Sequence, residues 1–397
     1  MKIAYITPYQ GPSLLKQRPI VRNRSLSNTV KIELIAKLLH SRSHTVEILS
    51  HGEVVEHQWK FYPSFCEPDL FHRDILVHYI SALPIRRLNG LWSSIGMLRL
   101  LKERHRACPF DLVIIFNLKR PQIACANYAI RHLRLPVILE YEDDAFLNVL
   151  GEPSRGFGTR YHRTAFAKVL NTVSGCIAVS PHLLSQLPSG IPKLLLRGFV
   201  GDDIVLAGKQ ENARKINRVL FAGTHTKSNG IDQLITAWKE MGLSDWELHV
   251  TGYGDMTETL HEMAKGSPGI VFHGLVSRPE LIDLMRSAKI CINPCAPSQT
   301  PGNVFAFKII EYLAAGAHVI TTPMGTLEPD IETGITYMKD NSPQTIAATL
   351  SEVIRNSRFK ATAEDAVRQR YGAPAVSEAV ELLIREVVND SAKRCAP

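Results

Sequence analysis

The sequence has no long apolar run. None of its hydrophobic segments approaches the roughly 18 to 20 residues that a helix needs to cross a bilayer. The first residues, MKIAYITPY, lack the apolar region of a secretion signal and have instead the pattern of a buried strand. We therefore expect a cytoplasmic protein with no membrane-spanning segment.

Cysteine is scarce and irregularly spaced. The chain has 7 cysteines among 397 residues, an odd number without regular spacing, and this favours reduced thiols over a disulfide framework. Cys291 and Cys295 form a C-x3-C pair, but no second pair of Cys or His follows at the spacing of a zinc finger. We expect no metal site.

The composition is that of a soluble globular protein, and the length allows two domains with full cores. The net charge of +8 is unevenly distributed: residues 1–200 carry 26 Lys and Arg against 14 Asp and Glu, and the remainder carries 20 against 24. A basic first half predicts a polyanionic partner, such as an anionic membrane surface, a nucleic acid or an acidic saccharide. No nucleic-acid motif is recognisable, so we expect no nucleic-acid partner.

Short apolar runs alternate with helical patterns in both halves of the chain. This alternation predicts parallel sheets that are covered by helices on both faces. The expected strands are KIAYIT, TVEILS, LVIIF, PVILEY and CIAVS in the first half, and RVLFAG, ELHVTG, IVFHG, ICINP and HVITT in the second. The expected helices include residues 27–39, 121–133, 230–241 and 278–287.

The fold class that this pattern predicts is α/β, with two doubly wound Rossmann-like domains. We expect the first domain at residues 1–200 and the second at residues 201–373, because a polar stretch separates the two blocks of strands. The tail, residues 374–397, has an amphipathic helical pattern, and we expect it to pack back on the body of the protein.

One stretch, NVFAFKIIEYLAAGAHVI at residues 303–320, is almost wholly apolar but carries Lys308 and Glu311. Residues 305–315 contain no Gly or Pro, so they predict a helix that ends at Gly316 and leads into a strand. An exposed ion pair, worth about 0.2 to 0.5 kcal/mol, would explain the two charges. Alternatively, the start of the helix and its Lys bind a phosphate, and the Glu accepts hydrogen bonds from sugar hydroxyls.

Three further loops follow expected strands of the second half, and ligands of such sheets bind at the carboxyl ends of the strands. GTHTKSNG, residues 223–230, offers small residues, hydroxyls and Lys227 before a helix, as a phosphate-binding loop does. TGYGD, residues 251–255, supplies two glycines, and FHGLVSRPEL places Gly274 and Val276 in a turn that could bind a base edge. Each loop alone also fits an ordinary strand-to-helix connection.

The order of these motifs resembles the C-terminal domain of retaining glycosyltransferases of family four, which have the GT-B fold of two Rossmann-like domains facing a central cleft. The resemblance covers roughly residues 217–340 and includes the sequence K-x-x-E-Y-L-A-A-G. It implies that Glu311, the second position of the family's E-x7-E motif, binds the ribose of a donor nucleotide. Three positions depart from the pattern: Asn303 replaces the first Glu, Thr224 stands near the family's phosphate-binding Arg, and Lys227 lies two residues before the place of the family's Lys.

The resemblance implies a retaining glycosyltransferase of hexosyltransferase type that acts in polysaccharide or glycoconjugate synthesis. Its donor would be a nucleotide-diphosphate sugar, and its acceptor a saccharide or a lipid-linked saccharide. Such enzymes need no metal, and the nucleotide-sugar is a substrate, so we expect no cofactor. The departing diphosphate would be stabilised by Lys227 and Lys308, which we expect to be catalytic. The donor-binding residues that the resemblance implies are Gly11, Gly223, Thr224, Gly252, Gly274, Val276, Asn303, Val304, Phe305 and Glu311.

In the first half, the resemblance implies an acceptor-binding domain. The segment EYEDDAF, residues 140–146, follows an expected strand and resembles a family segment that approaches the reacting sugar. We expect Asp143 to be catalytic, because crowded carboxylates repel one another and one of them should have a raised pKa. Helix capping by Asp143 or Asp144 would explain the same residues.

Residues 83–106, LPIRRLNGLWSSIGMLRLLKERHR, mix basic with apolar side chains. This pattern is typical of an amphipathic helix at an anionic membrane surface, and it would suit a lipid-linked acceptor and a peripheral location on the inner face of the membrane. A surface helix whose apolar stripe packs in the core has the same pattern.

Two other functions fit the same fold. A sugar-nucleotide epimerase would need an acid and a base around C2 of the sugar, and the sequence reveals no such set. A non-catalytic binder of nucleotides or saccharides is favoured by Asn303 and by the missing Arg near residue 224.

Overall fold

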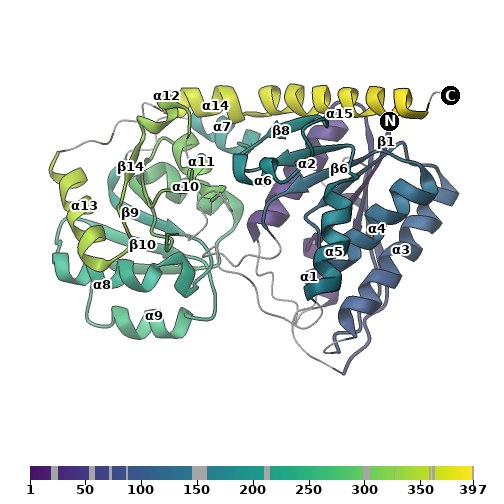
Figure 1. Ribbon diagram of the computed structural model, residues 1–397. Helices are drawn as coiled ribbons and strands as arrows, with labels where there is room; N and C mark the ends of the chain where they lie inside the picture. The colour runs from purple at the N-terminus through teal and green to yellow at the C-terminus, as the bar shows by residue number, and fades with distance from the viewer. Residues whose placement is uncertain are drawn as a thin grey trace. The chain divides into compact units, whose positions relative to one another are not determined.

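The structure is a computed structural model that describes residues 1–18, 26–52, 59–70, 74–85, 88–144, 159–209, 215–297, 305–325, 327–356, 359 and 363–395 (Figure 1). The chain divides into two compact units. The described residues within 1–196 and 377–395 form the first unit, and those within 197–376 form the second.

Eight strands among the described residues of the first unit form one sheet in the order β3-β4-β2-β1-β5-β6-β7-β8. All neighbouring strands are parallel except β3 and β4. Strands β2 to β4 lie on one side of β1 and strands β5 to β8 lie on the other, so the strand order reverses between β1 and β5. The strands are β1 (Lys2–Thr7), β2 (Thr45–Ser50), β3 (Phe65–Leu70), β4 (Ile75–Tyr79), β5 (Leu112–Phe116), β6 (Val137–Tyr141), β7 (Gly175–Ala178) and β8 (Lys193–Leu195).

Helices cover both faces of this sheet, which explains why β5 is wholly apolar and why β5 and β6 are buried along their whole length. Figure 1 shows α3, α4 and α5 side by side on one face. The helices are α1 (Pro12–Gln17), α2 (Leu26–Ser41), α3 (Asn89–Ala107), α4 (Arg120–Tyr128), which continues as a π-helical turn (Ala129–Leu133), α5 (Thr159–Leu170) and α6 (Pro181–Ser185).

In the second unit, six strands of the described chain form a fully parallel sheet in the order β11-β10-β9-β12-β13-β14. Counted along the chain, this is the order 3-2-1-4-5-6 of a dinucleotide-binding sheet, and its direction reverses between β9 and β12. The strands are β9 (Ile216–Ala222), β10 (Glu247–Thr251), β11 (Ile270–Gly274), β12 (Ala288–Asn293), β13 (His318–Thr321) and β14 (Ile335–Tyr337).

The helices of this unit are α7 (Asp202–Lys209), a 3-10 turn (Lys227–Asn229), α8 (Ile231–Met241), α9 (Thr257–Ala264), α10 (Arg278–Ser287), α11 (Lys308–Ala314), α12 (Pro329–Glu332), α13 (Pro343–Arg355) and α14 (Glu364–Tyr371). Helices α8 to α12 connect successive strands of this unit, whereas α7 precedes β9 and α13 and α14 follow β14.

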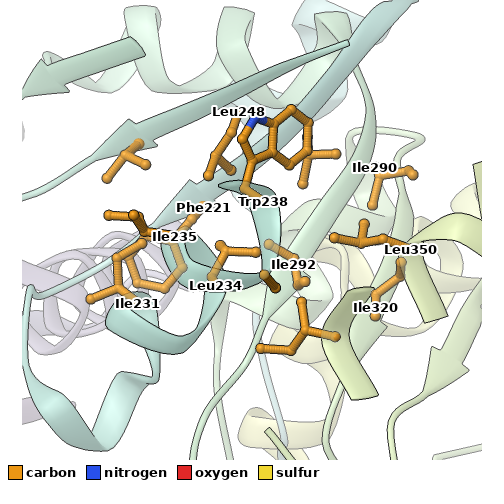
Figure 2. Packing of buried hydrophobic residues seen from close by; sticks show 14 of the residues in the cluster. Phe221, Ile231, Leu234, Ile235, Trp238, Leu248, Ile290, Ile292, Ile320 and Leu350 are labelled. Carbon is orange, nitrogen blue, oxygen red and sulfur yellow. The ribbon is translucent and has the colours of Figure 1, made fainter. Parts of the chain in front are cut away.

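The core of the second unit holds β9 and β12 in place. Leu234 and Trp238 lie on one face of α8 and pack with Leu350 of α13 against Phe221 and Ile292 of the two strands (Figure 2). Each buried side chain of this size contributes about 1.5 to 3 kcal/mol to stability. The carboxyl ends of the two central strands are therefore fixed relative to each other.

The last helix, α15 (Ala373–Cys395), contacts the first unit from residue 377 onward. His44, just before β2, lies 2.9 Å from the Glu381 carboxylate, measured between Nε2 and Oε2. At the start of β7, a Cβ on Gly175 would lie only 2.4 Å from a methyl group of Val387. The helix thus crosses the amino ends of the strands and requires a glycine there.

The expected strands agree with the structure to within two residues. The helix expected at residues 305–315 is α11, which begins only at Lys308 and ends at Ala314, and Gly316 lies two residues after its end with a φ of 73°. Sequence reasoning missed β3, β4, β8 and β14. Of these, β3 has the sequence FCEPDL and lies at the sheet edge, where a proline and charged residues are tolerated.

Candidate active site

Lys308 lies where the strand order of the second unit reverses, which is where sheets of this kind bind ligands. Its Nζ is 4.8 Å from the centre of the Phe221 ring near the end of β9. A Cβ on Gly223, just after β9, would lie 3.1 Å from the same nitrogen. The thiol of Cys295, which follows β12, is close enough to affect its charge. Lys308 therefore places an ammonium group between the ends of the two central strands.

Within the part of the chain that the structure describes, this ammonium lacks a counter-ion. Among the residues that the structure describes, no carboxylate oxygen lies within 4.0 Å of the Lys308 Nζ. Burial lowers the pKa of Lys308, because the charged form loses hydration. An unpaired, largely enclosed cation is unfavourable unless an anion binds to it. The site is thus suited to a phosphate group of a ligand.

Glu311, one turn further along α11, is buried and does not pair with Lys308. Its Oε1 lies 2.6 Å from Nη2 of Arg278, the first residue of α10. The Nε of Arg278 donates a hydrogen bond to Oδ2 of Asp203 in α7, at 2.9 Å. The exposed ion pair between Lys308 and Glu311 that the sequence allowed is therefore absent. Burial raises the pKa of Glu311, and the charge of Arg278 opposes that rise.

Tyr312 fixes α11 to the end of β9. Its hydroxyl donates to the carbonyl oxygen of Ala222 at 3.1 Å and accepts from the Ala222 N–H at 2.9 Å. Because this tyrosine follows Glu311 directly, the two bonds hold both Lys308 and Glu311 in position relative to the loop that starts at Gly223.

The loop after β9 is packed tightly between two neighbouring loops. A Cβ on Gly252, after β10, would lie 1.9 Å from the carbonyl oxygen of Gly223. A Cβ on Gly230, where the φ is 66°, would lie 1.9 Å from the carbonyl oxygen of Pro294 after β12. These glycines therefore allow the backbones to approach each other closely. Lys227, also in this loop, is exposed.

The other predicted donor-binding residues near α11 and the loop after β9 differ in burial, and two of them are not described by the structure. The Thr224 carbonyl oxygen accepts a hydrogen bond from the Asn229 side chain at 2.7 Å, within the same loop. Phe305 is half-buried ahead of α11, whereas Asn303 and Val304 lie outside the described residues.

The turn with Gly274 and Val276 supports α10. The Gly274 carbonyl accepts hydrogen bonds from the Gly252 N–H and from the Thr251 hydroxyl, both at 2.8 Å. Val276 is half-buried, and Ser277 after it caps α10 in a reciprocal bond with the third residue of the helix. The turn thereby fixes the residue that starts α10, Arg278.

Gly11 follows β1 in the first unit, and its N–H is already in use. It donates to the Tyr79 hydroxyl at 3.2 Å. A Cβ on Gly11 would lie 2.6 Å from the ring of Tyr9, so the glycine makes room for this tyrosine. The structure gives Gly11 a packing role, and its predicted contact with the donor stays a prediction.

Asn117, directly after β5, holds the segment that contains Asp143. Its φ is 55°, a left-handed conformation that asparagine tolerates better than most residues. Its side-chain oxygen accepts hydrogen bonds from the N–H groups of Glu142 and Asp143, at 2.8 and 3.2 Å, and its amide donates to Asp143 Oδ2 at 3.3 Å. Loss of hydration beside the surrounding protein raises the pKa of Asp143, and the hydrogen bond from Asn117 opposes that rise.

Three buried side chains and the half-buried Glu142 form a polar cluster next to this segment, which sequence reasoning missed. Lys31 of α2 contacts the Glu142 carboxylate and lies 3.6 Å from Oε1 of Glu140, while the Tyr5 hydroxyl donates to Glu140. Burial is the main cause that raises the pKa of Glu142 to about 7, with Lys31 opposing and Glu140 adding to the rise. The raised pKa expected among these carboxylates thus falls most clearly on Glu142.

Comparison with known proteins connects the second unit with sugar transfer. Residues 216–356 match the family of glycosyl transferases group 1. Gly223, Lys308 and Glu311 all lie inside the matched segment. No curated protein sequence matches the chain.

Solved structures resemble the chain over nearly its whole length. Sucrose-phosphate synthase from Thermosynechococcus elongatus has a TM-score of 0.70 at 13% identity, covering 98% of this chain and 100% of that one. HepE from Anabaena in complex with UDP-glucose has a TM-score of 0.65 at 16% identity, covering 97% and 100%. A protein assigned as a UDP-N-acetylglucosamine 2-epimerase from Listeria monocytogenes has a TM-score of 0.59 at 12% identity, covering 98% and 97%.

At these identities the likeness shows the fold, and the predicted GT-B class with two Rossmann-like domains is confirmed. The predicted resemblance to glycosyltransferases is confirmed at the level of group 1. Family four and retention of configuration stay predictions.

Replacing Glu142 by Gln should change stability in a pH-dependent way. The pKa of about 7 in the folded protein exceeds the value of about 4.3 in an unfolded chain, so the unfolded chain loses this proton first as the pH rises. The native protein should therefore lose about 3 kcal/mol of stability relative to Glu142→Gln between pH 4.5 and pH 7. Urea unfolding across this range measures the difference.

Glu258→Gln, an exposed carboxylate in α9, is the matched control and should show no such trend. A stability difference between native protein and Glu142→Gln that stays constant with pH would contradict the burial of this carboxylate.

Proposed function

We propose that the protein is a glycosyltransferase that moves a sugar from a nucleoside-diphosphate sugar to a saccharide or lipid-linked acceptor. The observation that carries this proposal is the unpaired ammonium of Lys308, placed beside Gly223 where the strand order reverses and one turn before Glu311. The match of residues 216–356 to glycosyl transferases group 1 supports it.

The chemistry of the donor fits these two side chains. As the bond between the sugar and the diphosphate breaks, negative charge grows on the leaving oxygen, and a cation already in place stabilises it. Lys308 would supply that cation, assisted by exposed Lys227 on the neighbouring loop. Glu311 would accept hydrogen bonds from the hydroxyls of the pentose. Lysine ammonium groups can stabilise the leaving diphosphate without a metal, so we propose metal-independent transfer.

On the acceptor side, we propose that Asp143 binds a hydroxyl group of the acceptor. Its carboxylate is exposed, and Asn117 holds both its backbone and one of its oxygens. Transfer of a hexose with retention of configuration is the further part of the proposal, and it rests on the sequence resemblance of residues 217–340.

The donor can be identified by titrating UDP, GDP and ADP into the protein in a calorimeter. We test UDP first, because HepE was solved with UDP-glucose. Hydrolysis or transfer from the matching nucleotide sugar, with and without a chelator, then tests catalysis. Binding followed by turnover in the presence of chelator supports the proposal.

Each alternative function has its own outcome in this experiment. Nucleotide binding without turnover would identify a non-catalytic binder. Interconversion of UDP-N-acetylglucosamine with its C2 epimer would identify an epimerase, the activity assigned to a protein of similar fold. If no nucleoside diphosphate binds, the proposed function is wrong.

Lys308→Ala should lower turnover far more than it weakens donor binding. The charge on the diphosphate is largest in the transition state, so loss of the cation should reduce kcat by about a hundredfold and change KM less. Steady-state kinetics with the donor identified above measures both constants. Lys339→Ala removes an exposed lysine of the same unit and should leave both unchanged. An unaltered kcat in Lys308→Ala would remove the lysine from the mechanism.

We also propose that α3 attaches the protein to an anionic membrane surface. Met97 and Leu101 of this helix are buried in the core, so one apolar stripe is accounted for by packing. A second stripe of the helix is exposed, and the ring of its Trp92 lies 6.2 Å from the ring of Phe61, measured between centroids. The exposed side chains are Trp59, Phe61, Leu88, Leu91, Trp92 and Ile95, with exposed fractions between 38% and 83%.

Exposed apolar side chains gathered in this way mark a site of interaction. The exposed cations Lys60 and Arg99 lie on the same two segments, and an anionic bilayer would attract them. None of the described helices has the length and apolar character to cross a bilayer, so attachment would be through this surface. Such a location would suit a lipid-linked acceptor.

The double variant Leu91→Ser/Ile95→Ser should bind vesicles containing phosphatidylglycerol at least about tenfold more weakly than the native protein at low salt. Each exposed leucine or isoleucine that enters the bilayer contributes about 1.5 to 3 kcal/mol. Flotation of the vesicles measures binding. Leu382→Ser, which removes an equally exposed leucine from α15, should have no effect. Absence of binding by the native protein would refute membrane attachment.

A further inference from the structure

Arg278 connects three helices of the second unit. It starts α10, where the capping serine Ser277 and the turn before it fix its backbone. Its guanidinium lies between Asp203 of α7, at 2.9 Å, and Glu311 of α11, at 2.6 Å. Because Asp203 holds the guanidinium from one side, the other side is presented to Glu311 in a fixed orientation.

Glu311 is left with one oxygen for a ligand. Arg278 contacts Oε1, and among the described residues Oε2 has no hydrogen-bond partner. Burial makes the neutral form of this carboxylate more favourable, which raises its pKa. A neutral carboxyl group would be a poor acceptor for the hydroxyls of a sugar. Some nearby positive charge must therefore keep Glu311 ionised.

Of the charged groups around Glu311, Arg278 is the one placed to keep this carboxylate ionised. Lys308, on the same helix, sits over the Phe221 ring. Arg368 of α14, the helix packed behind α11, donates to the carbonyl oxygen of Ala314 and pairs with Glu364. Asp203 from α7 is negative and acts against ionisation. Among the described residues, the guanidinium of Arg278 is thus the cation in direct contact with this carboxylate.

We propose that Arg278 is a positioning residue for the donor: it keeps Glu311 charged and turns its free oxygen toward a hydroxyl of the nucleotide's pentose. This inference rests on the proposed function, because it assumes that a nucleotide binds at α11. Sequence comparison with family four directs attention to the loop after β9, where Thr224 stands near an expected Arg. In the structure the guanidinium comes from α10 and not from the loop after β9, and it contacts Oε1 of Glu311.

The test is calorimetric titration of UDP into the native protein, Arg278→Met and Arg278→Lys over the range pH 6 to 8. Removing the guanidinium should shift ionisation of Glu311 to higher pH. The ratio of the Kd of Arg278→Met to that of the native protein, in which ionisation of UDP itself cancels, should therefore grow as the pH falls. It should approach about a tenfold increase for each pH unit below the pKa of Glu311 in the variant.

Arg278→Lys keeps the charge but loses the planar fork, so it should restore much of the affinity and flatten the pH dependence. Arg355→Met, which removes an exposed arginine from α13, is the control and should bind UDP as the native protein does. Glu311→Gln should weaken UDP binding about tenfold to hundredfold, the range for a hydrogen bond to a charged group. Adding Arg278→Met to Glu311→Gln should weaken binding no further, because the two residues act through one contact.

The outcomes separate this inference from the function on which it rests. If the native protein binds UDP but Arg278→Met and Arg278→Lys bind with unchanged Kd, the positioning role is wrong and the proposed function stands. A loss in Arg278→Met that is the same at every pH, or one that adds fully to Glu311→Gln, also overturns it. Failure of the native protein to bind any nucleoside diphosphate overturns both.

Discussion

An ammonium group that no described carboxylate neutralises is the constraint around which the second unit is organised. Lys308 is held against the ring of Phe221 and beside Gly223, where burial removes part of its hydration. The protein can keep it there only because Tyr312 anchors the helix to β9 through two hydrogen bonds and a large apolar cluster holds β9 beneath it. The stability of the sheet thus offsets the unfavourable burial of the Lys308 ammonium, which stays available for an anionic ligand.

Lys31 of the first unit and Lys308 of the second differ in how the protein compensates their charge. In the first, Lys31 is surrounded by Glu140 and Glu142, so the cation is neutralised within the protein and one carboxylate tends to hold its proton. In the second, no described carboxylate lies within 4.0 Å of the Lys308 Nζ, and the carboxylate nearest to it in sequence, Glu311, contacts an arginine instead. Only the second arrangement leaves a positive charge for a ligand to neutralise.

Much of the fold could be predicted from the sequence, because most central strands are short runs of β-branched and aliphatic residues and helices such as α8 and α13 have a clear apolar period. The position of Lys308 and Glu311 on one short helix also followed from local spacing. The residues that contact Glu311 and Glu142 could not be predicted from local spacing. Arg278 lies 33 residues from Glu311 in sequence, and Lys31 lies 111 residues from Glu142. No local pattern encodes such contacts.

The glycines show a related limit of sequence patterns. A glycine-rich loop after a strand is a common sign of phosphate binding, yet Gly252 and Gly230 are explained here by carbonyl oxygens only 1.9 Å from where a Cβ would be. The same residue type permits both a close ligand and a close backbone, so the sequence alone could not separate them.

The path of the chain through α15 has a consequence for biosynthesis. Residues 197–376 form the second unit, and the chain then returns to the first, where Val387 fills the space left by Gly175. During translation, the amino-terminal strands emerge from the ribosome long before the segment that covers their ends. The first unit therefore lacks α15 until the whole of the second unit has been synthesised. It can reach its final packing only after the second unit has had time to fold.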